Sequence, residues 1–369
     1  MRVLFVTSIP SPYRVDFLNA MGQVCDLEVI FEARRDPACH FNLYGEEQLH
    51  FSHHFLSEDK TYRDFMPRGV WRVLTSHYDR LIIHTWHTRT QMCLLLLLKV
   101  LRRPYWFETD GGIINTGESC TRRWLKRLLI GGAQGYFSPS ALTDDYLVYY
   151  GARAERIHRY SFTSVSDGDV LPALVTQPQR LALRHELGLP ADRPLLLAVG
   201  QFIPRKGFDV LLQAMSVIAV RQDIASMPAL AIVGGKPTAA YLQQCHELGL
   251  DSHVHFVGYC SKQKLSSYYM AADIFVLPTR EDIWGLVINE AMACGLPVVT
   301  TDRCVAGLEM LSHQHVTIVP VGDVAALAQS VAQLLGDVQL RQQIAQYNLD
   351  YSRQHSVERM ASDHVSQLR

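Results

Sequence analysis

The sequence predicts two α/β domains, each built on a doubly wound parallel sheet. Three observations support this fold class. Short apolar runs alternate with segments of helical period along most of the chain, which is the pattern of consecutive βαβ units. The alternation stops at a polar, turn-rich stretch, residues 164–179, and then starts again. The length of 369 residues is enough for two domains of ordinary size.

The strand candidates are short apolar runs, each followed by a loop and a helical segment. In the first half they are Val3–Thr7, Leu27–Phe31, Leu81–His84, Tyr105–Phe107 and Gly135–Ser138. In the second half they are Leu195–Val199, Leu230–Val233, His255–Val257, Ile274–Leu277, Val298–Thr300 and Thr317–Val319. From about Asp337 onward the pattern is helical. We therefore expect a first domain at 1–165, a second at 166–345 and a closing helix at 346–369.

The composition is that of an average globular protein and narrows the function classes. Hydrophobic residues make up 48% of the chain and charged residues 19%, so a disordered chain is excluded. With a net charge of -1 the chain has no overall field that attracts nucleic acid, and no nucleic-acid partner is expected. The first predicted strand is followed by Ile9-Pro10-Ser11-Pro12 instead of a GxGxxG turn, which argues against a nicotinamide enzyme.

The cysteines and the N-terminal residues indicate a cytoplasmic protein. The eight cysteines are scattered without CxxC pairs, as expected for reduced thiols. The opening MRVLFVTSIP lacks a signal-peptide cleavage site, and the longest apolar run, Met92–Leu98, is too short to span a bilayer. Residues 122–130 alternate basic and bulky apolar side chains at helical spacing, which fits either a peripheral helix on an anionic membrane or an ordinary domain helix. The inner face of the cytoplasmic membrane is therefore a second expected location.

The most informative segment is Leu277–Val298, which reads as a buried strand, an acidic loop and a helix. Gly285 permits a tight turn into the helix, where the free amides of Gly285 and Leu286 are placed to hold a phosphate. Glu290 is the single carboxylate among apolar helix residues, and two ribose hydroxyls would supply the hydrogen-bond donors that it needs. Asp282, on the loop, would bind the hydroxyls of a second polar ligand. The alternative is that the acidic loop only interacts favourably with the helix dipole.

A second segment, Ala198–Leu211, has the same order of strand, glycine turn and helix. Arg205 and Lys206 stand at the start of this helix, where the helix dipole already carries partial positive charge. An anion is therefore the missing component, and a diphosphate would supply it. The alternative is two solvated surface cations, which cost little free energy.

These residues resemble the donor-site motifs of retaining GT-B glycosyltransferases of the family-four group. The similarity lies in Arg205-Lys206-Gly207, in the spacing from Asp282 to Glu290 and in the run Gly285–Val298, and it extends more weakly over the first half. The family motif usually begins with glutamate, so the resemblance leaves open whether Glu281 or Asp282 contacts the donor sugar. It implies two Rossmann-like domains that face each other across a cleft, with C-terminal helices packing back on the first domain.

The resemblance also implies a role for each donor-site residue. Glu290 would hold the ribose of a nucleotide sugar, and Asp282 would bind hydroxyls of the sugar. Arg205 and Lys206 would neutralise the diphosphate without a metal or other cofactor, since no paired-carboxylate metal motif is visible. The donor-binding residues implied in this way are Gly200, Arg205, Lys206, Gly234, Gly235, Gly258, Asp282, Gly285, Leu286, Val287 and Glu290.

The first half is expected to bind the acceptor. Polar clusters at residues 84–89 and 108–112 each follow a predicted strand, so both lie at the same edge of the sheet. Glu108 stands where family members often have a histidine, and Glu108 or Asp110 is expected to orient the acceptor hydroxyl or the donor sugar. The acceptor-binding residues expected are Tyr13 and Arg14, from a proline-rich loop, with His84, His87 and Asp110; the catalytic residues expected are Asp282, Glu290, Arg205, Lys206 and Glu108.

The resemblance therefore implies a retaining hexosyltransferase. It would move a hexose from a nucleotide sugar, most commonly a UDP-sugar, to a glycan or lipid-linked glycan, as bacterial enzymes of surface-polysaccharide synthesis do. Three alternatives stay open: a nucleotide-sugar epimerase, a phosphorylase on the same architecture, and a two-domain sugar-binding protein that closes without reaction. An epimerase would act without an acceptor, and a phosphorylase would need a cofactor lysine.

Overall fold

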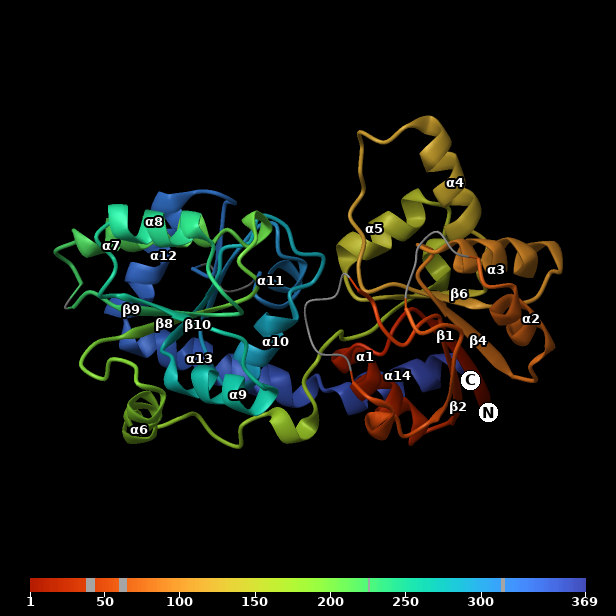
Figure 1. Ribbon diagram of the computed structural model, residues 1–369, viewed down its shortest axis with the longest axis horizontal. Coiled ribbons are helices and arrows are strands. Elements are labelled where there is room, and N and C mark those ends of the chain that lie inside the picture. The colour runs from red at the N-terminus through yellow and green to blue at the C-terminus, as the bar shows by residue number, and fades with distance from the viewer. Residues whose placement is uncertain (38–43, 60–64, 225, 313–315) are drawn as a thin grey trace. The chain divides into compact units, whose positions relative to one another are not determined.

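The structure, a computed structural model, describes residues 1–37, 44–59, 65–224, 226–312 and 316–369. It divides into two compact units, one of Met1–Ser166 with His355–Arg369 and one of Asp167–Gln354. Figure 1 shows a twisted sheet with helices packed against it in each unit. The predicted fold class is confirmed, because every pair of neighbouring strands within each sheet is parallel.

The sheet of the first unit has two strands that the sequence analysis missed. Its strands are β1 (Arg2–Thr7), β2 (Asp26–Phe31), β3 (Ser52–Phe55), β4 (Arg80–His84), β5 (Trp106–Glu108), β6 (Gly135–Ser138) and β7 (Ile157–Arg159). Their order is β3-β2-β1-β4-β5-β6-β7, so the missed strands β3 and β7 are the two edges. Edge strands are partly exposed and carry polar side chains, here SHHF and IHR, and so they lack the continuous apolar run of a central strand.

The helices of the first unit connect these strands. They are α1 (Pro12–Gly22), α2 (Pro67–Thr75), α3 (Arg89–Val100), α4 (Cys120–Ile130), α5 (Ala141–Tyr149) and α14 (Val357–Leu368), with short 3-10 turns at Glu46–Gln48 and Ala154–Arg156. Tyr13 and Arg14, expected in a loop, lie instead in the first turn of α1. Pro12 opens that helix, a position that proline favours because its missing N–H would have no intrahelical partner there.

The second unit has a six-stranded sheet that contains every strand predicted for it. Its strands are β8 (Leu195–Val199), β9 (Ala229–Val233), β10 (Val254–Val257), β11 (Ile274–Leu277), β12 (Val298–Thr301) and β13 (Ile318–Val319), in the order β10-β9-β8-β11-β12-β13. Its helices are α6 (Gln177–Leu187), α7 (Phe208–Ala219), α8 (Ala239–Glu247), α9 (Lys262–Ala271), α10 (Leu286–Ala293), α11 (Val305–Met310), α12 (Val324–Gly336) and α13 (Val338–Gln354), with 3-10 turns at Asp167–Asp169 and Pro204–Lys206. In Figure 1, α7, α8 and α12 cover one face of this sheet, and α9 and α13 lie on the other.

The return of the chain to the first unit begins later than the expected residue 346. Helix α13 runs through that position and stays in the second unit, where the Asn348 side chain donates a buried hydrogen bond to the Leu296 carbonyl at 2.7 Å. Helix α14 then packs on α1 in the first unit (Figure 1). Ser356 caps α14 by accepting from the backbone N–H of Arg359 at 3.3 Å.

Helix α4 contains residues 122–130, and its basic side chains are not all solvated. Lys126 is buried and pairs with Glu118 at 2.7 Å, which ties the helix to the loop before it. Leu129 and Ile130 face the core, whereas Trp124 is 66% exposed. No helix within the described ranges is both long and apolar enough to cross a bilayer. The cysteines with described positions are all free thiols, and Cys39 lies outside the described residues.

Candidate active site

A close ion pair in the second unit joins two loops that follow adjacent strands. Strands β8 and β11 pair in parallel, so the loops at their carboxyl ends meet at one edge of the sheet. There the Lys206 ammonium lies 2.5 Å from an Asp282 carboxylate oxygen, and the Arg205 guanidinium lies 3.6 Å from the other. Arg205 also donates to the backbone carbonyl of Glu281 at 2.7 Å. The structure thus brings together the two cations and the acidic loop that the sequence analysis singled out.

This contact differs from two expectations drawn from the sequence, the identity of the anion and the position of the cations at the start of a helix. The anion expected beside Arg205 and Lys206 is, in this structure, the carboxylate of Asp282. Moreover, the two cations lie in a 3-10 turn that ends before α7, so they precede the helix N-terminus and do not form its first turn. The Glu281 side chain is exposed, whereas that of Asp282 is buried among the cations. Asp282 is therefore the carboxylate of the acidic loop that pairs with both cations.

Gly207 lets the backbone after Lys206 pass close to Pro278, which directly follows β11. Replacing Gly207 with alanine is therefore expected to destabilise the second unit. Its φ is 68°, and a Cβ there would lie 2.0 Å from the Pro278 carbonyl oxygen. Because a left-handed backbone alone costs a non-glycine residue about 1–2 kcal/mol, we expect Gly207→Ala to lower the unfolding free energy by about 2 kcal/mol or more. Thermal and urea unfolding would measure it. The matched control is Gly336→Ala at the end of α12, where no atom lies within 4 Å and no loss is expected.

Helix α10 carries the second acidic residue of the motif. It starts at Leu286 after Gly285, so Leu286 and Val287 form its first turn, as expected. Glu290 lies one turn later and accepts a hydrogen bond from the Tyr269 hydroxyl at 2.9 Å. Burial, together with the nearby Glu290 carboxylate, raises the Tyr269 pKa well above its ordinary value of 10.0, so this phenol stays a donor. Tyr269 of α9 therefore supplies one of the two hydrogen-bond donors that the sequence analysis assigned to a ribose. The sequence did not predict this contact.

The glycines expected in a donor site lie at the carboxyl ends of three adjacent strands. Gly200, Gly234 and Gly258 follow β8, β9 and β10 respectively. Gly234 must be glycine because a Cβ there would lie 2.0 Å from the Gly200 carbonyl oxygen. The ring of Tyr259, 64% exposed, lies over Gly235, so close that a Cβ on Gly235 would meet it at 3.0 Å. These loops therefore form one continuous edge, as expected for a nucleotide site.

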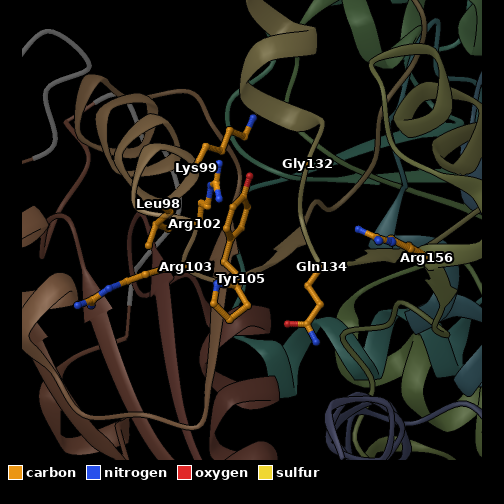
Figure 2. A pocket seen from close by; sticks show the side chains of 9 residues that line it. Leu98, Lys99, Arg102, Arg103, Tyr105, Gly132, Gln134 and Arg156 are labelled. Carbon is orange, nitrogen blue, oxygen red and sulfur yellow. The ribbon is translucent and has the colours of Figure 1, made fainter.

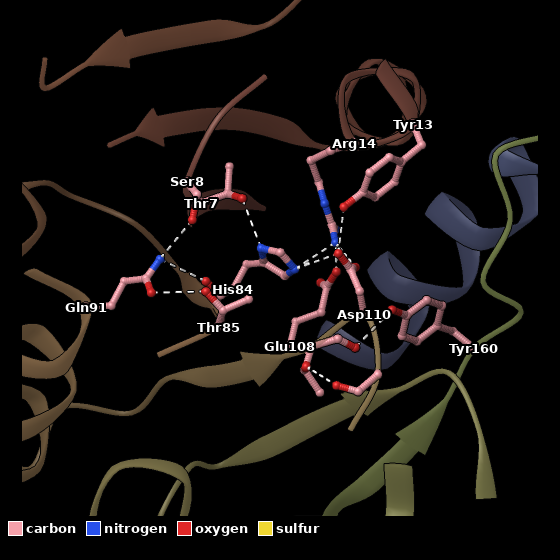
Figure 3. Close-up of polar contacts among 12 residues, drawn as sticks. Thr7, Ser8, Tyr13, Arg14, His84, Thr85, Gln91, Glu108, Asp110 and Tyr160 are labelled. Atoms are coloured by element: carbon pink, nitrogen blue, oxygen red, sulfur yellow. Dashed lines mark hydrogen bonds and ion pairs between the residues drawn. The ribbon is translucent and has the colours of Figure 1, made fainter. Parts of the chain in front are cut away.

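A buried polar network occupies the corresponding edge of the first sheet (Figure 3). Arg14 reaches in from α1 and forms ion pairs with Glu108, the last residue of β5, and with Asp110 just after it. Its Nη2 also lies 2.9 Å from Nε2 of His84. The same Nε2 lies 3.3 Å from an Asp110 carboxylate oxygen, and the other ring nitrogen, Nδ1, faces the Thr7 hydroxyl at 3.0 Å. Tyr13 donates to Asp110 at 2.7 Å.

The pKa shifts of Glu108, Asp110 and Tyr13 show which of these three groups are charged at neutral pH. Burial on its own would raise the pKa of Glu108, but Arg14 and then His364 outweigh burial and hold that pKa at about 2. Burial is likewise outweighed at Asp110, whose pKa is held below its usual range chiefly by Arg14. Burial and the neighbouring carboxylate raise the pKa of Tyr13. The two carboxylates are therefore ionised and the phenol is protonated.

Three of these residues have the donor types of a metal site. Ligand atoms of His84, Glu108 and Asp110 all lie within 4.8 Å of one another. The Arg14 guanidinium, however, contacts all three side chains and supplies the positive charge that the carboxylates require. A metal ion would have to displace this buried cation, so the residues present fit an arginine-centred network better than a metal centre.

The structure separates one expected acceptor residue from the network and adds others. His87 is exposed and packs against Trp86, with ring centroids 5.1 Å apart, outside the Arg14 network. His364 of α14 joins the network, its Nε2 lying 3.6 Å from Glu108 Oε2. Tyr160 packs on His364 with ring centroids 4.4 Å apart. His364 falls on the apolar stripe of α14, a spacing that would have marked it as buried.

The candidate site of the second unit lies within the part of the chain that matches a family model. Residues 179–350 match the family model described as glycosyl transferases group 1. The chain is 32% identical over 206 residues to a D-inositol 3-phosphate glycosyltransferase of Xylanimonas cellulosilytica, covering 55% of this chain and 48% of that protein. It is 36% identical over 166 residues to a GDP-mannose-dependent alpha-(1-6)-phosphatidylinositol monomannoside mannosyltransferase of Mycolicibacterium smegmatis, covering 43% of this chain and 42% of that one. The chain thus matches about half the length of these curated relatives.

Similarity to a solved structure extends over both units. Anabaena Alr3699/HepE in complex with UDP has a TM-score of 0.78 to this chain at 19% identity, covering 100% of this chain and 99% of that one. At this identity the similarity shows the fold. Residues 179–350, just under half of the chain, therefore match the glycosyl transferases group 1 family, and the chain as a whole has the GT-B fold.

Proposed function

We propose that this chain is a retaining glycosyltransferase that transfers a hexose from a nucleoside diphosphate sugar to a glycan or lipid-linked glycan. The observation that carries the proposal is the edge of the second sheet, where Arg205, Lys206 and Asp282 meet close to the N-terminus of α10. Cations and helix amides at one edge suit a diphosphate. A UDP-sugar is the favoured donor, since a fold neighbour is a UDP complex, while a relative named as GDP-mannose-dependent makes GDP-mannose the second candidate.

The proposed reaction depends more on stabilising the charge of the leaving group than on a general acid that donates a proton. The bond from the anomeric carbon to the diphosphate oxygen breaks, and its electron pair leaves with the nucleoside diphosphate. Lys206 and Arg205 would stabilise the charge that develops there, an effect worth about 10²–10³ in rate for one well-placed donor. Glu290 would hold the ribose, and Asp282 would bind the sugar hydroxyls. The acceptor oxygen then bonds to the anomeric carbon, and its proton passes to the departing diphosphate oxygen.

We place the acceptor hydroxyl at Asp110 in preference to Glu108. The Glu108 side chain is fully buried, and its oxygens face Arg14 and His364. The Asp110 side chain is 18% exposed, so a sugar hydroxyl can reach it. Glu108 is then a positioning residue that holds Arg14, which in turn orients Asp110. Polysaccharide or glycolipid synthesis in the cytoplasm, or at the inner face of its membrane, is the setting that we propose for this reaction.

Release of nucleoside diphosphate from UDP-glucose and GDP-mannose tests this function. With a bacterial glycolipid extract as acceptor, one of the two donors is expected to release its diphosphate, and release is expected to fall when the extract is omitted. Conversion of the donor sugar without an acceptor would instead support an epimerase. Release that depends on inorganic phosphate would support a phosphorylase, and binding without turnover would support a sugar-binding protein.

Membrane association through α4 is a further part of the proposal. Trp124 is 66% exposed on this helix, beside basic residues, and an exposed tryptophan with cations suits an anionic interface. We expect Trp124→Ala to lower binding to phosphatidylglycerol vesicles roughly tenfold in a flotation assay. The matched control is Trp71→Ala, since Trp71 is 71% exposed on α2 of the same unit. Equal losses in both variants, or none in either, would exclude α4 as the contact.

A further inference from the structure

A pocket of about 550 Å³ lies in the first unit, away from the candidate active site (Figure 2). Its lining includes Arg103 and Tyr105, which precede β5, and Arg156, which precedes β7. Glu108 and Asp110 lie at and after the opposite, carboxyl end of β5. The pocket is therefore at the amino ends of the strands, the edge of a doubly wound sheet that the proposed transfer reaction does not use.

The pocket is strongly basic. Lys99, Arg102, Arg103 and Arg156 line it, and none of its lining residues is a carboxylate. Three of these cations donate to backbone carbonyls, Lys99 at 3.1 Å, Arg103 at 2.6 Å and Arg156 at 3.3 Å. Such bonds orient the side chains at chain turns and helix ends but do not neutralise their charge. Burial lowers the pKa of Lys99 to about 8, which indicates a partly dehydrated cation without a compensating anion.

Two further groups in the pocket have unused hydrogen-bonding capacity. The Arg102 guanidinium is exposed and makes no hydrogen bond or ion pair with any residue that the structure describes. Its backbone φ of 51° lies in the left-handed region that non-glycine residues rarely adopt. Tyr105 is 98% buried, and its hydroxyl has no partner within the described part of the chain. Figure 2 shows the Tyr105 ring with its hydroxyl directed toward the side of the pocket where Lys99 lies.

We propose that this pocket binds a phosphate group. A free guanidinium fork matches two phosphate oxygens, a lysine ammonium adds a point charge, and a phenol donates one further hydrogen bond. The unpartnered Tyr105 hydroxyl favours phosphate binding over a purely structural role for the cations. If the cations only capped helix ends, no buried hydrogen-bond donor would be directed toward them. The volume also accommodates the organic part of a phosphoester. The phosphate belongs either to a small phosphoester in solution or to a lipid headgroup.

Binding measurements on four variants test this site. All are made in a Lys206→Met background, so that the donor site does not contribute to phosphate binding. The probes are inorganic phosphate, followed by calorimetry, and vesicles of phosphatidylcholine with or without phosphatidic acid, followed by sedimentation. The variants are the Lys206→Met parent, Arg102→Glu, Tyr105→Phe and the matched control Arg68→Glu, an exposed arginine on α2.

We expect the parent and Arg68→Glu to bind at least one probe. Arg102→Glu is expected to weaken that binding more than about tenfold, and Tyr105→Phe by about tenfold, because each removes a hydrogen bond to a charged group. Tyr105→Phe removes a hydroxyl without a partner, so its melting temperature is expected to match that of the parent. Binding of inorganic phosphate would identify a soluble phosphoester as the source, and binding to phosphatidic acid vesicles alone would identify a lipid. The proposal is overturned if neither probe binds, or if binding is the same in all four variants.

Discussion

Replacing Arg14 with methionine is expected to be among the most destabilising single changes in the first unit. The guanidinium is buried and pairs with Glu108 and Asp110, so its removal leaves one fully buried and one mostly buried carboxylate without that compensating charge. Loss of one partner from a buried ion pair costs about 3–5 kcal/mol. We expect a loss of unfolding free energy of that size, measured by urea denaturation at neutral pH. The control Arg34→Met removes an arginine paired only at the surface, with Glu46 and Glu58, and is expected to change stability little.

The pH dependence of the same variant distinguishes charge from packing. In the wild type the folded-state pKa of Glu108 is about 2, below its ordinary value of 4.5, so the stability that it contributes is present above pH 4.5 and is lost as the pH falls toward 2. In Arg14→Met, burial without the guanidinium would raise the same pKa. That variant should therefore gain stability relative to the wild type as the pH is lowered from 7 toward 5. An unchanged difference between the two proteins across this range would mean that Arg14 acts through packing alone.

Replacing Lys206 with methionine is expected to have the largest effect on turnover. Its ammonium lies 2.5 Å from Asp282 at the edge where the diphosphate is proposed to leave. Loss of one preorganised charge at a developing anion costs about 10²–10³ in kcat. We expect a fall of this size in nucleoside diphosphate release, with partial recovery in Lys206→Arg, which keeps the charge. The matched control is Lys264→Met, an exposed lysine on α9 of the same unit, and its turnover should equal that of the wild type.

A structural role for Lys206 predicts a different pattern. If the lysine only neutralised Asp282, then Asp282→Asn together with Lys206→Met would restore turnover, because no buried charge would be left unpaired. Under the proposed mechanism the double variant stays as slow as Lys206→Met. Single-turnover kinetics at saturating donor would separate the two cases, since they report the chemical step and not donor affinity.

Local segments of the site were predictable from the sequence. The strand, loop and helix that carry Asp282 and Glu290 are contiguous, so strand and helix periodicity and the two glycines were enough to place both carboxylates near a helix N-terminus. The ion pair of Lys206 with Asp282 was not predicted from the sequence, although parallel strands do bring the loops at their carboxyl ends to one edge of a sheet. Central strands were found for the same reason, because burial on both faces leaves a continuous apolar run.

The features that the sequence did not predict depend on contacts between segments that are far apart in the chain. Tyr269 meets Glu290 from a different helix, and His364 reaches Glu108 from the far end of the chain, so no spacing within one segment indicates either contact. The burial of Lys126 depends on Glu118 in a preceding loop. The expected boundary at residue 346 failed because α13 continues past it without a proline or glycine to mark an end. Patterns along the chain report the local fold, whereas these pairs are set by tertiary packing.

Nucleotide binding at the second-unit edge is the most direct test of the whole account. Thermal-shift assays with UDP, GDP and ADP would compare the wild type, Glu290→Ala and Glu247→Ala, an exposed glutamate of α8 that serves as the control. A nucleotide at 100 times its dissociation constant adds about 2.7 kcal/mol of stability. The account predicts that one nucleotide stabilises the wild type and Glu247→Ala but stabilises Glu290→Ala much less. Equal stabilisation of all three proteins, or none by any nucleotide at millimolar concentration, would contradict the assignment of this edge as the donor site.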